Sequence, residues 1–504
     1  MICLMASMCL LMLSGMSGYH YAARHEIRRN IFYVRDKSDF DRIAANGDLE
    51  GGDILVLWPL NLDGTYEMSS KPKLNDQHGD LNAEPTYIVG QKLFNRVLRT
   101  HNLTSDDMEA RAEARQLLSG FPKEGNRSPG SSLETGDLTS LTMSQVSFRT
   151  GAWSVSGFDI KGYTTKGSLI VVDSEAPVSA RLSLVSNRIS NCDRAFKTCS
   201  WNALGTNGEK RNGGVLIRIA SSAGTSLENN TFENLRGFIL ISVGEKASKV
   251  SIVHNTFSHL RPWAGNAAEA IHLGVVPPVK ASEDEPVFDW LDTVVADNLF
   301  NDASAENELI GVKGAGTRIV GNWIVNSKSG ISLRDGSDTL VEGNTIVRSY
   351  GIRIMGDRQT VRSNKIVLPI DNYGIWFENG AGQAGYACQQ SQPFGLLQFQ
   401  TWVGPLRWLY RPAREPSVTG NSIEVTPGGE SMAISRRNFE KPCGWRRCDG
   451  QPGSSIPCDR QLPDSEFQDI ECHGENKIAV HIDRRTQSGN QDNALALKSC
   501  NDQQ

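Results

Sequence analysis

Four ionisable residues between positions 306 and 334 have types and spacings that could carry chemistry. Glu306 and Glu308 are two residues apart, Lys313 follows five residues after Glu308, and Arg334 comes 21 residues after Lys313. Residues two apart on a strand point to the same face, so the two carboxylates would repel each other unless a cation lies between them. Ca²⁺, which prefers oxygen ligands, is a natural partner for such a pair. An isolated pair of this kind is also typical of an ordinary solvated surface.

The elements that must position these residues are set by a repeated pattern. Each copy has two or three apolar or β-branched residues, two spacers, an asparagine, one further residue, and then phenylalanine or isoleucine. Successive asparagines are separated by 43, 25, 43, 24, 22, 20 and 57 residues. A gap of 43 is either two units or one unit with a large loop. The asparagines are Asn187, Asn230, Asn255, Asn298, Asn322, Asn344, Asn364 and Asn421.

A period near 22 residues, with short strands and no intervening helix, predicts an all-β chain wound into a parallel β-solenoid. A leucine-rich repeat has a similar period but needs a fixed ladder of leucines, whereas these units prefer valine and isoleucine. Equivalent residues of a solenoid stack on adjacent coils about 4.8 Å apart. Stacked asparagines can hydrogen-bond one another at a turn, so we interpret them as structural. The outer faces of the coils would form a long groove suited to an extended polymer.

In a solenoid, Lys313 and Arg334 are one coil apart and should lie side by side. Two cations about 4 Å apart repel each other by about 4 kcal/mol at an effective dielectric of about 20. A purely structural protein has little reason to keep such a pair, whereas a site for an anionic sugar has a use for it. The net charge of −5 means that an anionic substrate would be attracted by a local basic cleft, because the whole molecule does not attract it.

The segments that flank the repeats predict caps on the solenoid. Ser38 would begin a short helix that runs to about Ala45 and covers the open end, and the segment 52–57 would be the first strand. Residues 67–145 interrupt the pattern, and we expect an inserted helix at 104–121. The predicted domains are a β-helix from 24 to 385 and a cysteine-rich C-terminal extension, with the last coil or coils, from 386 to 504.

The N-terminus and the cysteines predict an oxidising compartment. The apolar run 2–13 is too short to span a bilayer, and small and then charged residues follow it, so residues 1–23 resemble a secretory signal. A wrongly assigned start codon is the alternative, and no later stretch is expected to span a membrane. Eight cysteines beyond this segment suggest disulfides in a secreted or periplasmic protein. They are Cys192, Cys199, Cys388, Cys443, Cys448, Cys458, Cys472 and Cys500.

The combined pattern of Glu-x-Glu, a lysine five residues later and an arginine 21 residues after that resembles polysaccharide lyase family 6, which includes chondroitinase B and many alginate lyases. Three further segments resemble motifs of that family in the same order: "NAAEAIHLG" (266–274) its NGxExIRxG, "LRDG" (333–336) its LRHG, and "GIRIMG" (351–356) its GIRIxG. The segment 50–67 resembles its entry strand. The resemblance covers about residues 31–66 and 145–380 and implies a right-handed, single-stranded parallel β-helix.

The resemblance also implies a reaction and its residues. Family members cleave uronate-containing polymers by β-elimination, in which a base removes the C5 proton and Ca²⁺ neutralises the uronate carboxylate. Lys313 would be the base, and Arg334 would be the acid or, because arginine is a poor proton donor, the residue that stabilises the leaving oxygen. Arg353 would clamp a neighbouring carboxylate. The implied ligands of Ca²⁺ are Asn266, Glu306 and Glu308.

The chain departs from the family pattern at two residues expected to contact substrate. Asp335 stands where the family has histidine, and His272 stands where it has arginine, so both changes remove positive character. An insertion between Asn266 and Glu306 makes Asn266 the least secure ligand. Substrate subsites are therefore expected to differ from those of the family.

Several functions compete for this sequence. A lyase acting on alginate is favoured, and a lyase acting on dermatan or chondroitin sulfate is the alternative substrate class. A C5-epimerase would carry a DPH motif, and a pectinase-type hydrolase would need paired aspartates on a repeat strand; the sequence has neither. A non-catalytic polysaccharide-binding solenoid would keep the groove but would not need Lys313. Nothing suggests a nucleic-acid partner, and the oligomeric state is left open.

Overall fold

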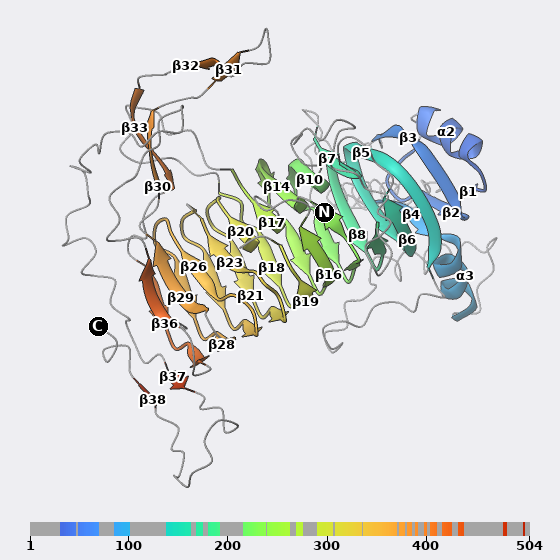
Figure 1. Ribbon diagram of the computed structural model, residues 1–504. Coiled ribbons are helices and arrows are strands. Elements are labelled where there is room, and N and C mark those ends of the chain that lie inside the picture. Colours follow the sequence, from blue (N-terminus) through green and yellow to red (C-terminus); the bar gives the residue numbers. More distant parts are fainter. Residues whose placement is uncertain are drawn as a thin grey trace, which may run out of the picture.

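Parallel strands, stacked coil upon coil, form most of the described part of the chain (Figure 1). The chain is a right-handed parallel β-helix, as the repeat and the family resemblance predicted. This computed structural model describes residues 31–46, 49–69, 85–100, 138–162, 168–174, 180–191, 215–237, 239–262, 269–275, 290–305, 308–334, 336–369, 372–378 and 416–425. It also describes short strands at 381–385, 389–391, 398–400, 404–410, 432–437, 477–480 and 497–498.

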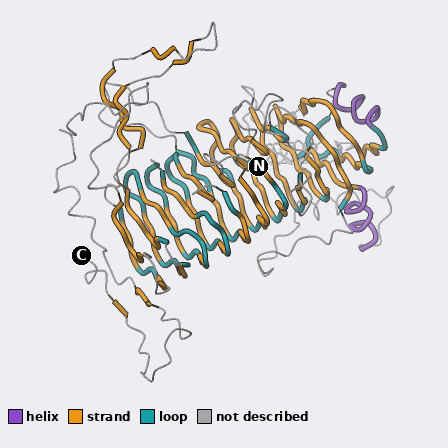
Figure 2. The backbone as a smooth tube through the Cα atoms, viewed as in Figure 1, coloured by secondary structure: helices purple, strands orange, loops and turns teal. Residues whose placement is uncertain are grey.

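Two helices cover the N-terminal end of the stack (Figure 2). Helix α2 (Lys37–Asn46) packs Phe40 into the main core, and helix α3 (Gln91–Thr100) buries Leu93 and Phe94 in a smaller cluster. The predicted helix over the open end is therefore present. Its N-terminus is capped by Asp36 and not by Ser38, because the Asp36 carboxylate accepts a hydrogen bond from the Asp39 N–H at 2.9 Å.

The first coil begins earlier than the sequence predicted. Strand β1 (Ile31–Val34) precedes α2 and pairs with β2 (Ile54–Leu57), which had been expected to be the first strand. Strand β4 (Thr86–Gly90) pairs with β2 on one side and with β5 (Thr139–Ser156) on the other. The segment 67–145 is therefore no simple insertion, because it supplies coil strands; the helix expected at 104–121 lies outside the described residues.

Strand β5 links the entry coils to the regular ones. Successive parts of it pair with β3 (Leu60–Ser69), β6 (Phe158–Gly162), β7 (Ile170–Asp173) and β8 (Ala180–Val185). One long strand therefore bends through the three sheet directions that shorter strands occupy in later coils.

Three columns of parallel strands follow, one strand of each column per coil. The first contains β8, β11 (Ser226–Glu228), β15 (Ser251–Val253), β18 (Val294–Ala296), β21 (Arg318–Val320), β24 (Leu340–Glu342), β27 (Thr360–Arg362) and β34 (Ser417–Thr419). The second contains β9 (Arg188–Ser190), β12 (Thr231–Glu233), β16 (Thr256–Pro262), β19 (Leu299–Ala303), β22 (Trp323–Val325), β25 (Thr345–Val347), β28 (Lys365–Leu368), β35 (Ser422–Val425) and β37 (Lys477–Val480).

The third column carries the candidate site. It contains β7, β10 (Val215–Ala223), β14 (Ile239–Ser248), β17 (Glu269–Leu273), β20 (Glu308–Val312), β23 (Gly330–Leu333), β26 (Ile352–Ile354), β29 (Tyr373–Glu378) and β36 (Met432–Arg437). The remaining strands are β13 (Arg236–Gly237), which pairs with β16, the antiparallel pairs β30 (Ala381–Gly385) with β33 (Gly404–Tyr410) and β31 (Gln389–Ser391) with β32 (Gln398–Gln400), and β38 (Leu497–Lys498), which pairs with β37.

The eight repeat asparagines form one continuous buried column, as predicted. The Asn322 side chain, for example, donates to the Asn344 Oδ1 at 2.9 Å and to the Val295 carbonyl at 2.9 Å. Asn187 bonds Asn230 and Asn364 bonds Asn421 in the same way, so the gaps of 43 and 57 residues are single coils with long connections. The coil near Asn421 belongs to the solenoid.

Aliphatic and aromatic side chains stack in parallel with the asparagines inside the coils. Phe232, Phe257 and Phe300 lie face to face with ring centroids 4.8 and 4.6 Å apart. This regular interior fixes the register of each strand, because a shift by one residue would turn apolar side chains outward. Among the residues that the structure describes, no helix has the length and apolar character needed to cross a membrane.

Candidate active site

The candidate site lies on the outer face of β17, β20, β23 and β26. Along these strands Ile271, Ile310, Ile331 and Ile352 are fully buried inside the coil. The residues that follow them in sequence therefore point outward, because side chains alternate along a strand. The outward row consists of His272, Gly311, Ser332 and Arg353, which are paired across the sheet in that order.

Lys313 and Arg334 are neighbours on adjacent coils. The preceding residues Val312 and Leu333 are paired across β20 and β23, and the Arg334 N–H donates to the Val312 carbonyl at 2.7 Å. The Lys313 N–H donates to the Leu273 carbonyl at 2.7 Å. Both residues therefore begin the turn that follows the third column, which confirms that they lie one coil apart and side by side.

Glu269, at the start of β17, contacts both Lys313 and His272. Its Oε2 lies 2.8 Å from the Nδ1 of His272, and its Oε1 lies 3.5 Å from the Nζ of Lys313. The Lys313 Nζ is also 3.3 Å from the His272 Nδ1, so the three groups contact one another. The Glu269 side chain is only 3% exposed, and those of His272 and Lys313 are 15% and 14% exposed. The amine is thus held in a largely buried position.

The charge state of Glu269 follows from two opposing influences. Burial disfavours the ionised form, but the hydrogen bond to His272 and the positive charges of Lys313 and Arg334 outweigh that penalty. The pKa of the Glu269 carboxyl is therefore lower than its ordinary value. We conclude that Glu269 is a carboxylate beside the amine of Lys313 at neutral pH.

Glu308, on the next coil, forms ion pairs with Arg334 and Arg353. Its Oε1 accepts a hydrogen bond from the Arg334 Nη1 at 2.8 Å and another from the Arg353 Nη2. The Arg353 Nε donates to the Ser332 hydroxyl at 2.8 Å, which fixes the plane of that guanidinium. Burial is the largest influence on Glu308 and raises its pKa, an effect that the charge of Arg353 opposes and the carboxylate of Glu269 reinforces.

The two buried carboxylates face each other over Gly311. A Cβ atom at position 311 would lie 2.3 Å from the Glu269 Oε2 and 3.0 Å from the Glu308 Oε2, so any side chain there would displace them. The Glu308 Oε2 is buried and has no hydrogen-bond partner among the described residues. A buried carboxylate oxygen without a partner fits a cation ligand, and Ca²⁺ takes oxygens of this kind.

The structure corrects the expectation that Lys313 and Arg334 repel each other as an uncompensated pair. Each has its own acidic partner, Glu269 for the lysine and Glu308 for the arginine. Of the three expected calcium ligands, only Glu308 is described. Asn266 and Glu306 lie outside the described residues. Within the part of the chain that the structure describes, no three His, Cys, Asp or Glu side chains are arranged so that they could hold a metal ion.

Of the other residues expected to contact substrate, Arg353 and His272 are described and Asp335 is not. Arg353 does clamp a carboxylate, but the carboxylate belongs to Glu308 of the chain itself. His272 lies inside the cluster as the hydrogen-bond partner of Glu269. Asp335, the signal segment 1–23 and all eight cysteines that were expected to form disulfides lie outside the described residues, so those expectations stay predictions.

Glu269 is the residue of this cluster to which sequence reasoning gave no role. It lies 44 residues before Lys313, and the pairing depends on a coil that contains a long connection. A signal was present, because Glu269 occupies the glutamate position of the NGxExIRxG-like segment.

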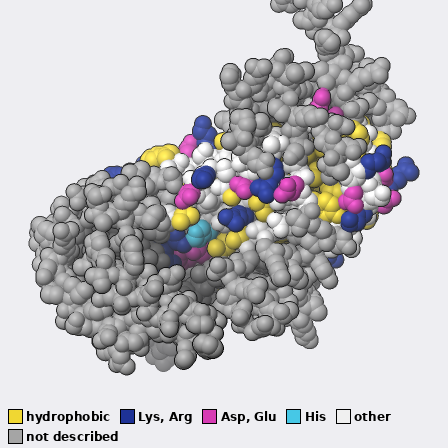
Figure 3. Space-filling model, turned by 90° about the horizontal axis from the view of Figure 1, so that it is seen from above, with side chains coloured by type: hydrophobic (Ala, Val, Ile, Leu, Met, Phe, Trp, Pro, Cys, Tyr) yellow, Lys and Arg dark blue, Asp and Glu magenta, His cyan; other side chains and the backbone are white. Residues whose placement is uncertain are grey.

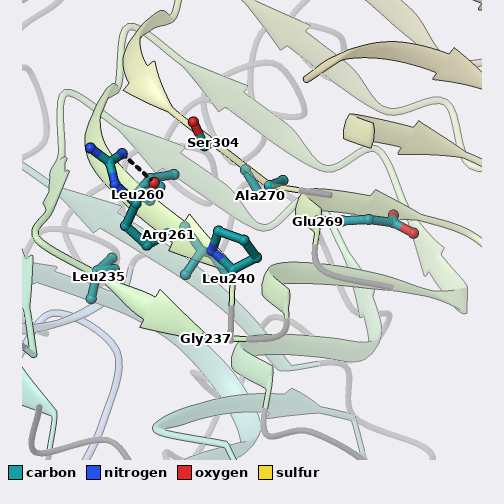
Figure 4. Close-up of a pocket in the computed structure, with 10 residues that line it drawn as sticks. Leu235, Gly237, Leu240, Leu260, Arg261, Glu269, Ala270 and Ser304 are labelled. Carbon is teal, nitrogen blue, oxygen red and sulfur yellow. Dashed lines mark hydrogen bonds between the residues drawn. The ribbon is translucent and has the colours of Figure 1, made fainter. Parts of the chain in front are cut away.

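Glu269 also lines a small, open pocket beside the cluster. Figure 4 shows Arg261 bonded to the Leu260 carbonyl at one side of this pocket, and the Glu269 carboxylate directed away from the other lining residues. The remaining wall is mostly apolar and includes Leu235 and Leu240. The pocket therefore lies behind the carboxylate and holds none of the cationic partners of the two acids.

The outer surface around these strands mixes charges of both signs. Figure 3 shows Lys and Arg side chains interspersed with Asp and Glu side chains over the described part of the face seen from above. Lys313, Arg334 and Arg353 form a local group of three cations, each paired with a buried carboxylate.

Comparisons with known proteins place this architecture among right-handed parallel β-helix proteins. Residues 185–384 match a family model described as "Periplasmic copper-binding protein (NosD)". A solved mannuronic-acid-specific polysaccharide family 6 lyase from human gut microbiota is 16% identical, with 82% of this chain and 84% of that chain covered and a TM-score of 0.52. A PL6 alginate lyase in complex with a trisaccharide is 15% identical, with 82% and 85% covered and a TM-score of 0.47. No curated protein sequence matches the chain.

The similarity to the mannuronic-acid-specific lyase, which runs over most of both chains, shows the fold. What a β-helix of this kind does is decided by its site, because one fold hosts many functions.

Proposed function

We propose that this protein is a polysaccharide lyase that cleaves a uronate-containing polymer by β-elimination, with alginate the favoured substrate. The observation that carries the proposal is the pair Lys313 and Arg334, held side by side on adjacent coils, each with a buried carboxylate partner. The similar solved structure, a family 6 lyase specific for mannuronic acid, supports the choice of reaction and of alginate.

The chemistry uses the chain's own cations. The Lys313 amine removes the C5 proton of a uronate, the electron pair forms the C4–C5 double bond, and the C4–oxygen bond breaks. Arg334 stabilises the negative charge that develops on the leaving oxygen, which takes its proton from the arginine or from water. A positioned general base of this kind contributes a rate factor of about 10²–10⁴.

Glu269 holds the base in this scheme. Its Oε1, 3.5 Å from the Lys313 Nζ, stabilises the ammonium that forms when the amine accepts the C5 proton. His272 bonds the other oxygen of the same carboxylate and limits its rotation. The three groups therefore act as one unit, in which the carboxylate sets the direction of the lysine.

Calcium is the cofactor that we propose for Glu308, with Glu306 and Asn266 as further ligands. The buried Glu308 Oε2 supplies an oxygen without a partner. A bound Ca²⁺ would neutralise the substrate carboxylate and so make the C5 proton more acidic. Arg334 and Arg353 already neutralise the other oxygen of Glu308 and orient it.

We also propose a secreted or periplasmic location. The family whose model matches residues 185–384 is described as periplasmic, and the N-terminal segment resembles a secretory signal. Such a location gives access to an anionic polysaccharide.

The test is ultraviolet absorbance during incubation with polymannuronate, polyguluronate, dermatan sulfate and chondroitin sulfate, each with Ca²⁺ and with a chelator. Elimination creates a double bond conjugated with the carboxylate, which absorbs, whereas hydrolysis and epimerisation do not. We expect absorbance to rise on an alginate polymer, and we expect the rate of this rise to depend on Ca²⁺. Lys313→Ala should lower the rate by at least about 10²-fold. Flat traces on every polymer, with binding retained, would instead indicate a non-catalytic polysaccharide-binding solenoid.

A further inference from the structure

Trp290 is the most exposed large apolar side chain among the described residues, at 61%, and it stands beside the candidate site. It lies just before β18, in the connection that follows β17. The equivalent connection of the next coil begins with Lys313, and that of the coil after it begins with Arg334. Trp290 therefore belongs to the row of turns that carries the two catalytic candidates.

The backbone of Trp290 is fixed to the turn that follows Lys313. Trp290 and Ala315 form a parallel bridge, and the Leu291 N–H donates to the Ala315 carbonyl at 3.0 Å. Leu291 is fully buried, and its side chain lies under Gly314. Leu291 is therefore anchored in the core, while the preceding residue, Trp290, lies on the surface.

The indole ring is held against a glycine. A Cβ atom at position 316 would lie 2.4, 2.7 and 2.8 Å from three atoms of the Trp290 ring, so the ring rests on bare backbone. Gly316 has a φ of +69°, a conformation that also favours glycine. One side of the ring is thus covered by the turn while most of the residue remains open to solvent.

Glycines occupy the positions that adjoin this turn on the two neighbouring coils. Gly274 and Gly336 approach Gly314 from the two neighbouring coils so closely that a Cβ on either would clash with its backbone. Gly316, which the Trp290 ring contacts, is three residues after Lys313. Three residues of chain span at most about 10 Å, so Gly316 lies within that distance of Lys313. Because the ring contacts Gly316, the indole is close enough to Lys313 for neighbouring residues of one polymer to reach both.

We propose that Trp290 is a stacking platform for a sugar residue of the polymer, next to the one whose C5 proton faces Lys313. A pyranose ring presents C–H groups on its faces, and an aromatic ring held in advance in one orientation binds such a face at little cost in conformational entropy. Single exposed apolar residues are common on protein surfaces; Trp290 differs because it is rigidly seated beside the candidate site. This inference rests on the proposed function, since it assumes that the polymer passes Lys313.

The test compares Trp290→Ala with Trp290→Phe and with Trp323→Ala as the matched control. Trp323 is also exposed, at 49%, but it lies on β22 in the second column of strands. Binding of mannuronate and guluronate hexamers is measured by calorimetry in a Lys313→Ala background, in which the hexamers are not degraded. Rates of elimination are measured in the chain with Lys313 intact.

We expect Trp290→Ala to weaken hexamer binding on the order of 3- to 10-fold and to raise KM by a similar factor with kcat nearly unchanged. Trp290→Phe should retain part of the affinity, and Trp323→Ala should bind like its parent. Unchanged binding by Trp290→Ala would overturn the platform while leaving the lyase intact. Hexamer binding that depends on Trp290, without elimination by the chain with Lys313 intact, would overturn the lyase and keep the platform. Failure of the parent to bind either hexamer would overturn the platform.

Discussion

Two sets of buried polar side chains in this β-helix handle their burial differently. Each amide of the asparagine column is satisfied: Asn255 and Asn298, for example, bond the next asparagine at 3.0 and 2.9 Å and also bond backbone carbonyls. In the acidic cluster, Glu269 and Glu308 are paired with cations, but one oxygen of Glu308 has no partner among the described residues. The asparagine column, which supports the fold, is fully bonded, whereas Glu308 retains bonding capacity that a ligand could use.

The largest expected effect is on catalysis, and it comes from a substitution in the acidic cluster. Glu269→Gln keeps the shape of the side chain but removes the charge beside Lys313, so the amine loses its fixed direction. We expect kcat for elimination to fall by about 10²-fold, measured by absorbance on the preferred polymer. The matched control is Glu342→Gln, which removes a partly exposed acid of the first column and should leave kcat unchanged. Equal losses in the two variants would contradict a specific role for Glu269.

The next largest effect is on the stability of the fold, and it comes from a substitution in the asparagine column. Asn322→Ala removes the side-chain donor to the Val295 carbonyl and leaves the Asn298 side-chain amide without its acceptor, the Asn322 Oδ1. We expect the free energy of unfolding in urea to fall by about 1–3 kcal/mol. Asn301→Ala, on a partly exposed position of β19, is the control and should change it by less than about 0.5 kcal/mol. A neutral Asn322→Ala would show that the column is dispensable.

The two acids should respond to pH with opposite signs. The pKa of Glu269 is lowered in the folded chain, so its contribution to stability is present above the ordinary value of 4.5 and is lost as pH falls through the folded pKa. The pKa of Glu308 is raised, so its contribution is present below 4.5 and is lost as pH rises through the folded pKa.

These signs can be read from urea unfolding of Glu269→Gln and Glu308→Gln at a series of pH values, in chelator. Relative to Glu269→Gln, the parent should lose stability on acidification below 4.5. Relative to Glu308→Gln, it should lose stability as pH rises above 4.5. The same sign for both acids would mean that their surroundings are not as different as the structure indicates.

The smallest expected effect concerns the solvated ion pairs on the outside of the coils. Arg362 and Glu342 are 2.8 Å apart, but their side chains are 48% and 32% exposed. Arg362→Ala should change the free energy of unfolding by less than about 1 kcal/mol, and high salt should reduce the difference further. A loss as large as that of Asn322→Ala would mean that charge on the surface supports the coils as strongly as the asparagines do.

Features that repeat in the sequence were predictable, and features that occur once were less so. The asparagine column and the adjacency of Lys313 and Arg334 both follow from a period, which translates directly into neighbouring coils. The pairing of Glu269 with Lys313 does not, because a long connection separates the two residues in sequence and only the register of β17 with β20 unites them.

The entry coils show the same limit. Strand β1 is four residues long and lies before the first asparagine, so it has no repeat to identify it. Helix α3 lies inside a segment that interrupts the pattern, and only its packing of Leu93 and Phe94 against the end of the coils shows that it is a cap. Burial of that kind depends on tertiary contacts that no local pattern specifies.

The single coils behind the gaps of 43 and 57 residues have a consequence for how such a chain can evolve. Because the asparagine fixes the register of each coil independently, a connection can gain or lose many residues without moving the strands above and below it. Changes in length are therefore tolerated in the connections between strands, and one of these connections carries Trp290 close to Lys313. Under the proposed function, a lengthened connection would change which sugars are bound while Lys313 and Arg334 keep their places on the coils.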